Sequence, residues 1–334
     1  MRRASISLPT TLLIGAVVIA LVVVGAWWAV PSRAELSAAA SRLAAVPPGW
    51  LVLAGVLALA PTAVEAVRVW LVARGFGARV PVGAAIDAAA ANSFFTAITP
   101  AAGLGEPAVA WVLRRRAGVE RDVAMAVPLA KFTTSFVAVF VAGAVTFALG
   151  GGPPRPWLRV TGALACAVAA LVMLAVIALA RRPALARRAL AWLGRRGRFA
   201  SRFAGNLAVH ALPSLERMAA LPARTLALLG LAHAVYFTAY ILPLAIVCEA
   251  LAPGTGATAL PRALAYLCAT FLAPTPGGAG VAEASAAAFF GDLIGRADAV
   301  IAVIAFRVAR FVAQVVVCGA LLAVRGVTAG RDER

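Results

Sequence analysis

The chain has 334 residues, of which 63% are hydrophobic and only 13% are charged, and its formal net charge is +18. A mean hydropathy of +0.94 excludes an ordinary soluble protein, so the composition predicts an integral membrane protein. The basic excess is then expected to mark the cytoplasmic side of the membrane rather than a nucleic-acid-binding surface. The four cysteines form no Cys-x-x-Cys pair and only two histidines occur, so neither a disulfide framework nor a zinc site is predicted.

Several apolar stretches are long enough to cross a bilayer, which takes about 20 residues of helix. They are residues 11–30, 49–73, 123–149, 158–180, 225–251 and 299–324. The first stretch follows Arg2 and Arg3 in the charge order of a secretory signal. Its length and the spans that come after it favour a retained first helix over a cleaved peptide.

Two further apolar stretches, residues 82–112 and 263–294, are interrupted near their middles by proline and glycine. Each is expected to form two half-helices around a break. Arg74 and Arg79 precede the first stretch and Arg114 follows it, so both flanks favour the cytoplasm and the stretch should be a re-entrant hairpin. The predicted fold class is an all-α polytopic membrane protein with about six transmembrane helices and two re-entrant half-helix hairpins.

This arrangement places both termini in the cytoplasm of a multi-pass protein of the bacterial inner (plasma) membrane. The connection from Arg181 to Arg224 is also cytoplasmic, with ten arginines and one acid, Glu216. It reads either as an interfacial amphipathic segment that contacts the anionic leaflet or as a positive-inside loop without lipid specificity. Four basic residues remain inside spans, namely Arg68, Lys131, Arg307 and Arg310.

The single transmembrane domain, residues 1–334, is predicted to contain two inverted repeats, 49–149 and 225–324, separated by the basic connection 181–224. Glu106 follows Pro100 by six residues and Glu283 follows Pro276 by seven. The next basic residues, Lys131 and Arg307, come 25 and 24 residues later. Helix, broken hairpin and helix thus occur twice with opposite orientation, as in inverted-repeat transporters.

Ionisable side chains inside a membrane are costly and are usually buried and paired. Glu106 with Lys131, and Glu283 with Arg307, are predicted to form two pseudo-symmetric ion pairs, with Arg310 nearby. These five residues are the candidates for binding a polar headgroup near the midplane. The alternative is that the same pairs are fixed salt bridges that anchor the hairpins.

A second group of residues is assigned to the geometry of the hairpins, because proline breaks a helix and glycine permits close approach of the backbone. It comprises Pro100, Gly103, Gly105, Pro276, Gly277, Gly278 and Gly280. Four further candidates are less direct. Glu65 and Arg68 are three apart and predict an intrahelical pair, while His233 and Tyr236 share a helix face, where a histidine is more often packed than a proton carrier.

The motif from Thr275 to Glu283, with sequence Thr-Pro-Gly-Gly-Ala-Gly-Val-Ala-Glu, together with Arg307, resembles a known family. It is similar to the transmembrane, flippase-like domain of lysylphosphatidylglycerol synthases, which also occurs as a stand-alone membrane protein. The run from Phe94 to Pro100 and Gly105-Glu106-Pro107 are similar to the first-half motif of the stand-alone members. The likeness covers roughly residues 49–324.

Two departures from the family pattern concern the first half: Ala101-Ala102 replaces a glycine-rich form, and Lys131 replaces an arginine. The chain also ends about ten residues after the last span, where the synthases continue into a soluble catalytic domain. The resemblance therefore implies the lipid-translocating half without the aminoacyl-transfer half.

The expected function is translocation of a lipid or lipid-linked compound between leaflets of the inner membrane. An aminoacylated phospholipid, a polyprenyl-phosphate-linked sugar and a neutral polycyclic lipid such as a hopanoid all fit. The alternatives are a secondary transporter for a small solute, or a non-transporting scaffold that regulates a lipid- or envelope-synthesis enzyme. No catalytic triad, metal-ligand cluster or phosphate-binding loop occurs, so no enzyme activity and no cofactor are expected.

Overall fold

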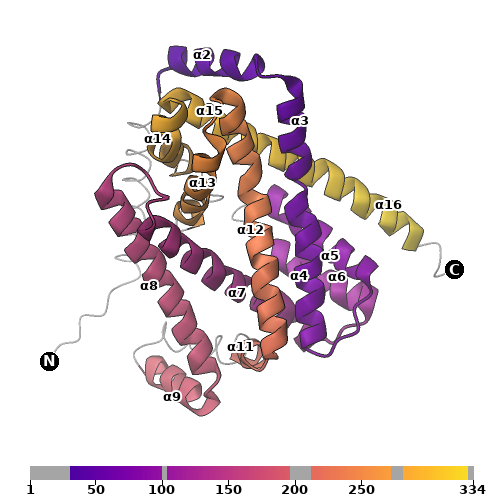
Figure 1. Cartoon of the computed structure of the whole chain (residues 1–334). Coiled ribbons are helices and arrows are strands. Elements are labelled where there is room, and N and C mark those ends of the chain that lie inside the picture. The colour runs from indigo at the N-terminus through magenta and orange to yellow at the C-terminus, as the bar shows by residue number, and fades with distance from the viewer. Residues whose placement is uncertain (1–30, 100–103, 196–211, 272–280, 330–334) are drawn as a thin grey trace.

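The computed structural model describes residues 31–99, 104–195, 212–271 and 281–329, and within these ranges all regular structure is helical (Figure 1). The predicted all-α polytopic fold class is confirmed. Among the described residues, five helices are long and apolar enough to cross a membrane. They are Pro48–Gly75, Arg121–Ala148, Pro156–Ala180, Ala223–Leu251 and Arg296–Gly326. Each matches a predicted span to within a few residues, and the predicted first span, 11–30, lies outside the described residues.

Two of these five spans are built from more than one helical segment. The first consists of α3 (Pro48–Leu57) and α4 (Ala60–Gly75). The last consists of α15 (Arg296–Ala313), a π-helical turn η4 (Gln314–Cys318) and α16 (Gly319–Ala329). A π-helical turn inside a longer helix is often found at a functional site. The remaining three spans are α7 (Arg121–Ala148), α8 (Pro156–Ala180) and α12 (Ala223–Leu251).

A short helix, α2 (Arg33–Ala44), precedes the first of these spans and was not predicted. Its N-terminus is a capping box, in which the Ser32 hydroxyl accepts from the Glu35 backbone N–H and the Glu35 carboxylate accepts from the Ser32 backbone N–H. The Glu35 carboxylate also accepts from the Ser32 hydroxyl at 2.7 Å, and this bond, followed by the one from the Ser32 backbone N–H, lowers the pKa of the Glu35 carboxyl. The Ser-x-x-Glu spacing was the available sequence signal. α2 packs on α15, where Arg42 pairs with Asp298 at 2.9 Å.

The first broken stretch folds into a hairpin of two helices, α5 (Val82–Ile98) and α6 (Gly105–Ala117). The helices run antiparallel, because Asp87 near the start of α5 pairs with Arg116 near the end of α6 at 2.8 Å. At the other end of the pair, Gly105 packs on α5: an added Cβ would come within 3.1 Å of the Asn92 carbonyl oxygen. Glycine at this position therefore permits the close approach of the two arms. We call α5 and α6 the first hairpin.

The second broken stretch likewise folds into two helices, α13 (Gly256–Phe271) and α14 (Val281–Ile294). Its first arm begins seven residues before the predicted start at residue 263 and runs through Pro261. Arg262 in α13 donates to the Phe289 carbonyl oxygen of α14 at 3.0 Å and forms an ion pair with Asp292. The start of one arm thus lies beside the end of the other, and we call α13 and α14 the second hairpin.

The two hairpins start at opposite ends of α12, as Figure 1 shows. α4 ends at Gly75, which packs so closely on Thr225 in the first turn of α12 that an added Cβ would lie 2.8 Å from the threonine methyl group. α5 follows α4 in the chain and so begins near this end of α12. α13 follows α12 directly and so begins near its other end. The last span contacts both hairpins, since α15 packs on α14 while η4 and α16 pack on α5.

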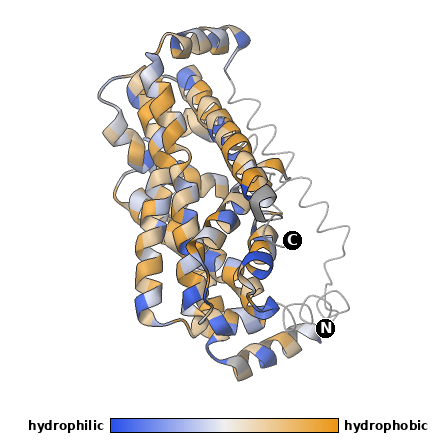
Figure 2. Cartoon of the chain, turned by 90° about the vertical axis from the view of Figure 1, so that its right-hand side faces the viewer, coloured by the Kyte–Doolittle hydropathy of each residue, from blue (hydrophilic) through white to orange (hydrophobic). Residues whose placement is uncertain are grey.

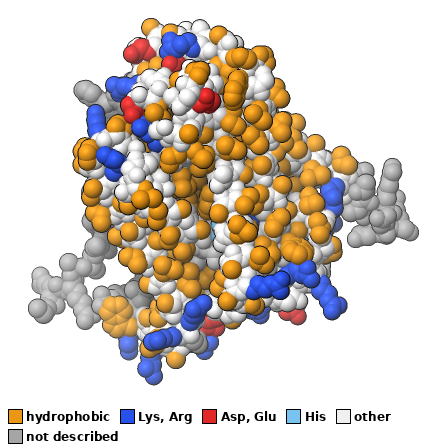
Figure 3. Space-filling model, in the orientation of Figure 1, with side chains coloured by type: hydrophobic (Ala, Val, Ile, Leu, Met, Phe, Trp, Pro, Cys, Tyr) orange, Lys and Arg blue, Asp and Glu red, His pale blue; other side chains and the backbone are white. Residues whose placement is uncertain are grey.

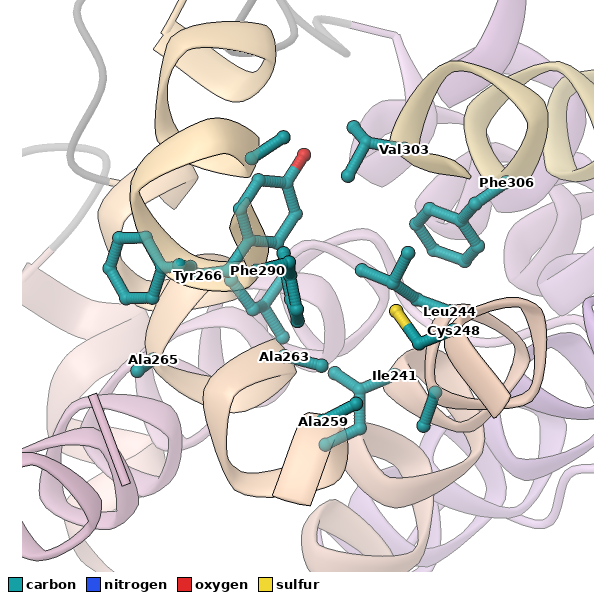
Figure 4. Close-up of a cluster of buried hydrophobic side chains, with 14 of the residues drawn as sticks. Ile241, Leu244, Cys248, Ala259, Ala263, Ala265, Tyr266, Phe290, Val303 and Phe306 are labelled. Atoms are coloured by element: carbon teal, nitrogen blue, oxygen red, sulfur yellow. The ribbon is translucent and has the colours of Figure 1, made fainter. Parts of the chain in front are cut away.

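Two hydrophobic clusters fill the interior. The larger joins α7, α12, the second hairpin and α15 and includes Phe140. Its members Leu244, Tyr266 and Phe290 are labelled in Figure 4. The smaller joins α4, the first hairpin and the start of α7. Alanine and glycine let these helices approach closely, which is how helices associate in a bilayer. At Gly143 of α7, an added Cβ would overlap the Cys268 thiol of α13.

The outer surface is apolar around the middle and charged at the ends (Figure 2, Figure 3). α8 buries only a few side chains, among them Cys166 and Ala170, and exposes most of its apolar ones. In Figure 3, Lys and Arg side chains gather along the lower end of the molecule, near α9 (Pro183–Gly194) and α11 (Leu212–Ala219) in Figure 1. An apolar belt between charged ends is the surface expected of a membrane-spanning protein.

Candidate functional site

Lys131 of α7 lies at the centre of a buried group of charges. Its ammonium pairs with the Glu65 carboxylate of α4 and, at 3.0 Å, with the Glu106 carboxylate of α6. The Lys131 and Glu65 side chains are 2% and 3% exposed, whereas that of Glu106 is 35% exposed. Glu106 lies in the first turn of α6, where the helix dipole favours a negative charge. The predicted pair between Glu106 and Lys131 is present, and Glu65 joins it from a third helix.

Glu65 accepts two further hydrogen bonds, which makes it the most connected carboxylate of the group. The Arg68 guanidinium donates at 2.6 Å, as the spacing of three residues predicted, and the Asn92 amide of α5 donates at 2.9 Å. We call Glu65, Arg68, Glu106 and Lys131 the first ion cluster. It contains two carboxylates and two cations, so its charge is balanced, as burial requires. Sequence reasoning placed Glu65 in the second rank because it saw only the partner on the same helix.

A polar chain continues from the first ion cluster to α12. Arg68 donates to the Ser135 hydroxyl of α7, and Ser135 lies 3.4 Å from Nδ1 of His233. The other ring nitrogen of His233 lies 2.9 Å from the Thr134 hydroxyl. His233 is 1% exposed. It is therefore a packed and hydrogen-bonded histidine, which is the more common of the two roles considered for it.

The second half of the chain carries its own charges. Glu283, in the first turn of α14, forms an ion pair with Arg307 of α15, as predicted. Their side chains are 25% and 31% exposed, so this pair is more accessible than the pair between Lys131 and Glu65. Arg310 follows one turn later on α15, and its guanidinium lies 3.4 Å from the centroid of the Tyr240 ring. We call Glu283, Arg307 and Arg310 the second ion cluster.

Two tyrosines of α12 connect the clusters. The Arg68 guanidinium lies 4.2 Å from the centroid of the Tyr236 ring, and the Tyr236 and Tyr240 rings are 6.2 Å apart. The Tyr240 ring in turn faces Arg310, which gives a row of cation, ring, ring and cation. α12 thus presents an aromatic stripe between Arg68 of α4 and Arg310 of α15. The sequence showed only that residues of this stripe share a helix face.

The hairpin residues Pro100, Gly103, Pro276, Gly277, Gly278 and Gly280 lie outside the described residues. Asp87 pairs with Arg116 of α6 and, at 2.5 Å, with Arg325 of α16. Among the described residues, no group of three or more His, Cys, Asp or Glu could hold a metal ion.

Two surface pockets lie apart from the ion clusters. One, of about 500 Å³, is lined by Trp111, three arginines of α6 and α7, and their connecting residues. The other, of about 460 Å³, lies between the start of α8 and the second hairpin and includes Asp292 and Arg296. Neither pocket is lined by a residue of the first or second ion cluster.

These features define a polytopic helical membrane protein whose spans and hairpins enclose paired charges and an aromatic stripe. Residues 12–318 match the family model of the lysylphosphatidylglycerol synthase TM region. The chain belongs to this family, as its hairpin motifs predicted. A comparison with curated individual proteins finds no match.

Proposed function

We propose that this protein moves a lipid or lipid-linked molecule between the leaflets of the bacterial inner membrane. The observation that carries the proposal is the row of charges and rings from Lys131 of α7 to Arg310 of α15, which links the first ion cluster to the second beneath an apolar outer surface. A polar headgroup entering between the hairpins has alternative partners along this row, while its acyl chains remain in the bilayer. We assign no covalent step and no cofactor to the protein.

The partly exposed carboxylates are the points at which a headgroup first exchanges with the ion pairs. Glu106 keeps 35% and Glu283 keeps 25% of its side chain exposed. An anionic group that binds Lys131 or Arg307 replaces the carboxylate on that cation. The displaced carboxylate, Glu106 or Glu283, is partly exposed, so its charge is less costly to leave without that partner than a fully buried one. The deeply buried Glu65 and Arg68 then hold the α4 side of the row in place during the exchange.

We further infer that the two hairpins are re-entrant and belong to inverted repeats, 49–149 and 225–324. Support comes from their starts at opposite ends of α12 and from the contact of the last span with both. Transport then proceeds by rocking of one half against the other around the row of charges.

We also propose that the lower end of the molecule in Figure 3 faces the cytoplasm. The segment Arg181 to Arg224 would then contact the anionic inner leaflet. In its described part, α9 exposes Arg187, Arg188 and Trp192, side chains typical of an interfacial helix.

The test is lipid scrambling by the purified protein in liposomes, followed by chemical quenching of headgroup-labelled lipids in the outer leaflet. We expect protein-dependent movement that is lost in the Glu283→Ala, Arg307→Ala double variant. The matched control is Arg42→Ala, Asp298→Ala, which removes an ion pair of the same kind between α2 and α15.

If both double variants scramble like the unmodified protein, the site assignment is wrong. If the folded, unmodified protein moves no lipid of the panel, the result favours the small-solute carrier or the scaffold for a synthesis enzyme.

A further inference from the structure

The second ion cluster has one more cation than carboxylate among the described residues. Arg307 pairs with Glu283, whereas Arg310 forms no ion pair in the described part of the chain. Nη1 of Arg310 is buried without a hydrogen-bond partner. The first ion cluster contains two carboxylates and two cations and needs no further charge. The two clusters together therefore carry one uncompensated positive charge, and it belongs to Arg310.

The surroundings of Arg310 leave its guanidinium able to accept a ligand. Tyr240 covers one face of the guanidinium, at 3.4 Å from its ring centroid, and this contact does not use the N–H donors. Gln314 lies one turn further along the same helix, is 7% exposed, and begins the π-helical turn. A guanidinium held on an aromatic ring with its N–H edge unused matches the planar, bidentate geometry of a phosphate or carboxylate.

We propose that Arg310, held on Tyr240, binds the phosphate of a lipid whose headgroup has a net negative charge. This inference rests on the proposed function and selects among its substrates. A phosphodiester supplies the one negative charge that the clusters lack. A neutral polycyclic lipid leaves Arg310 uncompensated, and a lysine-bearing headgroup adds a cation where a cation is already in excess.

The first experiment measures lipid retention by the purified full chain in native mass spectrometry. The probes share their acyl chains: dioleoylphosphatidylglycerol is anionic, dioleoylphosphatidylcholine is zwitterionic and dioleoylglycerol is uncharged. We expect retention of phosphatidylglycerol about tenfold above that of dioleoylglycerol, with phosphatidylcholine between them. Equal retention of phosphatidylglycerol and dioleoylglycerol overturns the proposal.

Variants locate the effect at Arg310. Arg310→Gln should lower the retention of phosphatidylglycerol about tenfold. Arg310→Lys keeps the charge but loses the planar pair of N–H donors, so it should lower retention by less than Arg310→Gln. Other arginines also attract this lipid, so the control is Arg224→Gln, the same change at an exposed position in the first turn of α12. Equal retention by Arg310→Gln and Arg224→Gln contradicts the proposal. If Arg310→Gln does not fold, Tyr240→Leu tests the same binding site, because it removes the ring that holds the Arg310 guanidinium. This variant should lower retention severalfold.

Two further arms separate this inference from the proposed function and from a soluble ligand. Excess glycerol 3-phosphate should not displace the lipid. If it does, Arg310 binds an anion, but the proposal that this anion is the phosphate of a lipid is wrong. If the protein scrambles phosphatidylglycerol and Arg310→Gln scrambles it equally well, Arg310 is not a phosphate-binding residue, and the flippase proposal is unaffected. If lipid binding depends on Arg310 but the protein scrambles no lipid, phosphate binding at Arg310 is supported and the flippase proposal is refuted.

Discussion

The Lys131 ammonium lies 3.0 Å from the Glu106 carboxylate, although the two residues belong to different helices and Lys131 is almost fully buried. The same ammonium pairs with Glu65, so one cation connects α4, α6 and α7. These ion pairs hold α6, the second arm of the first hairpin, against α4 and α7. Glu106 is the more exposed of the two carboxylates, so its contact with Lys131 is the one that the proposed headgroup exchange would use.

Replacing Lys131 by Met should destabilise the protein strongly, by about 3–5 kcal/mol, because the buried Glu65 and the partly exposed Glu106 would be left with one arginine. Lys131→Arg should fold, since it keeps the charge. The double variant Lys131→Met, Glu106→Gln restores the balance of Glu65 with Arg68 and should recover part of the loss. The thermal midpoint in detergent is the measurement, and a double variant no more stable than Lys131→Met would contradict the charge-balance explanation.

Asp87 should stabilise the packing of the first hairpin against the end of the last span. Its buried carboxylate pairs with Arg116 of α6 and with Arg325 of α16. Asp87→Asn weakens both charge-assisted contacts, with an expected loss of about 1.5–3 kcal/mol. Hydrogen exchange should then accelerate in α16. The matched control is Asp298→Asn at the other end of the molecule, which should leave exchange in α16 unchanged.

Gly105 should tolerate no side chain. An added Cβ would overlap Thr96 and approach Asn92 of the neighbouring arm, so Gly105→Ala must push the two arms apart. The expected cost is about 1–3 kcal/mol, seen as a lower thermal midpoint and as reduced scrambling. Gly230→Ala is the control, because an added Cβ on that exposed face of α12 meets nothing within 4 Å. Equal midpoints for the two variants would show that the hairpin does not need this close approach.

Cysteine labelling tests the proposed orientation. The four native cysteines are buried and free, so they should react slowly with an impermeant maleimide. Ser37→Cys on α2 should be labelled in intact cells. Ala189→Cys on α9 and Glu120→Cys, just before α7, should be labelled only after the membrane is opened. Labelling of Glu120→Cys from outside would contradict a first hairpin that enters and leaves on the cytoplasmic side.

The sequence alone determined the class of the protein and much of its outline. Spans longer than 20 apolar residues leave few alternatives to helices, because a bilayer offers no water to backbone groups. The prolines and glycines marked both hairpins, and the pairs Glu106 with Lys131 and Glu283 with Arg307 followed from spacing and from the need of intramembrane charges for partners.

The tertiary structure alone decided how those charges are shared. Glu65 pairs with Lys131 and binds Asn92, partners 66 and 27 residues away, and no helical periodicity encodes such contacts. The same holds for the rings of Tyr236 and Tyr240, which join Arg68 to Arg310 only because α12 packs against both α4 and α15. Local sequence fixes which face of a helix a residue occupies, whereas the identity of its partner depends on which helices pack together, and that is a property of the whole chain.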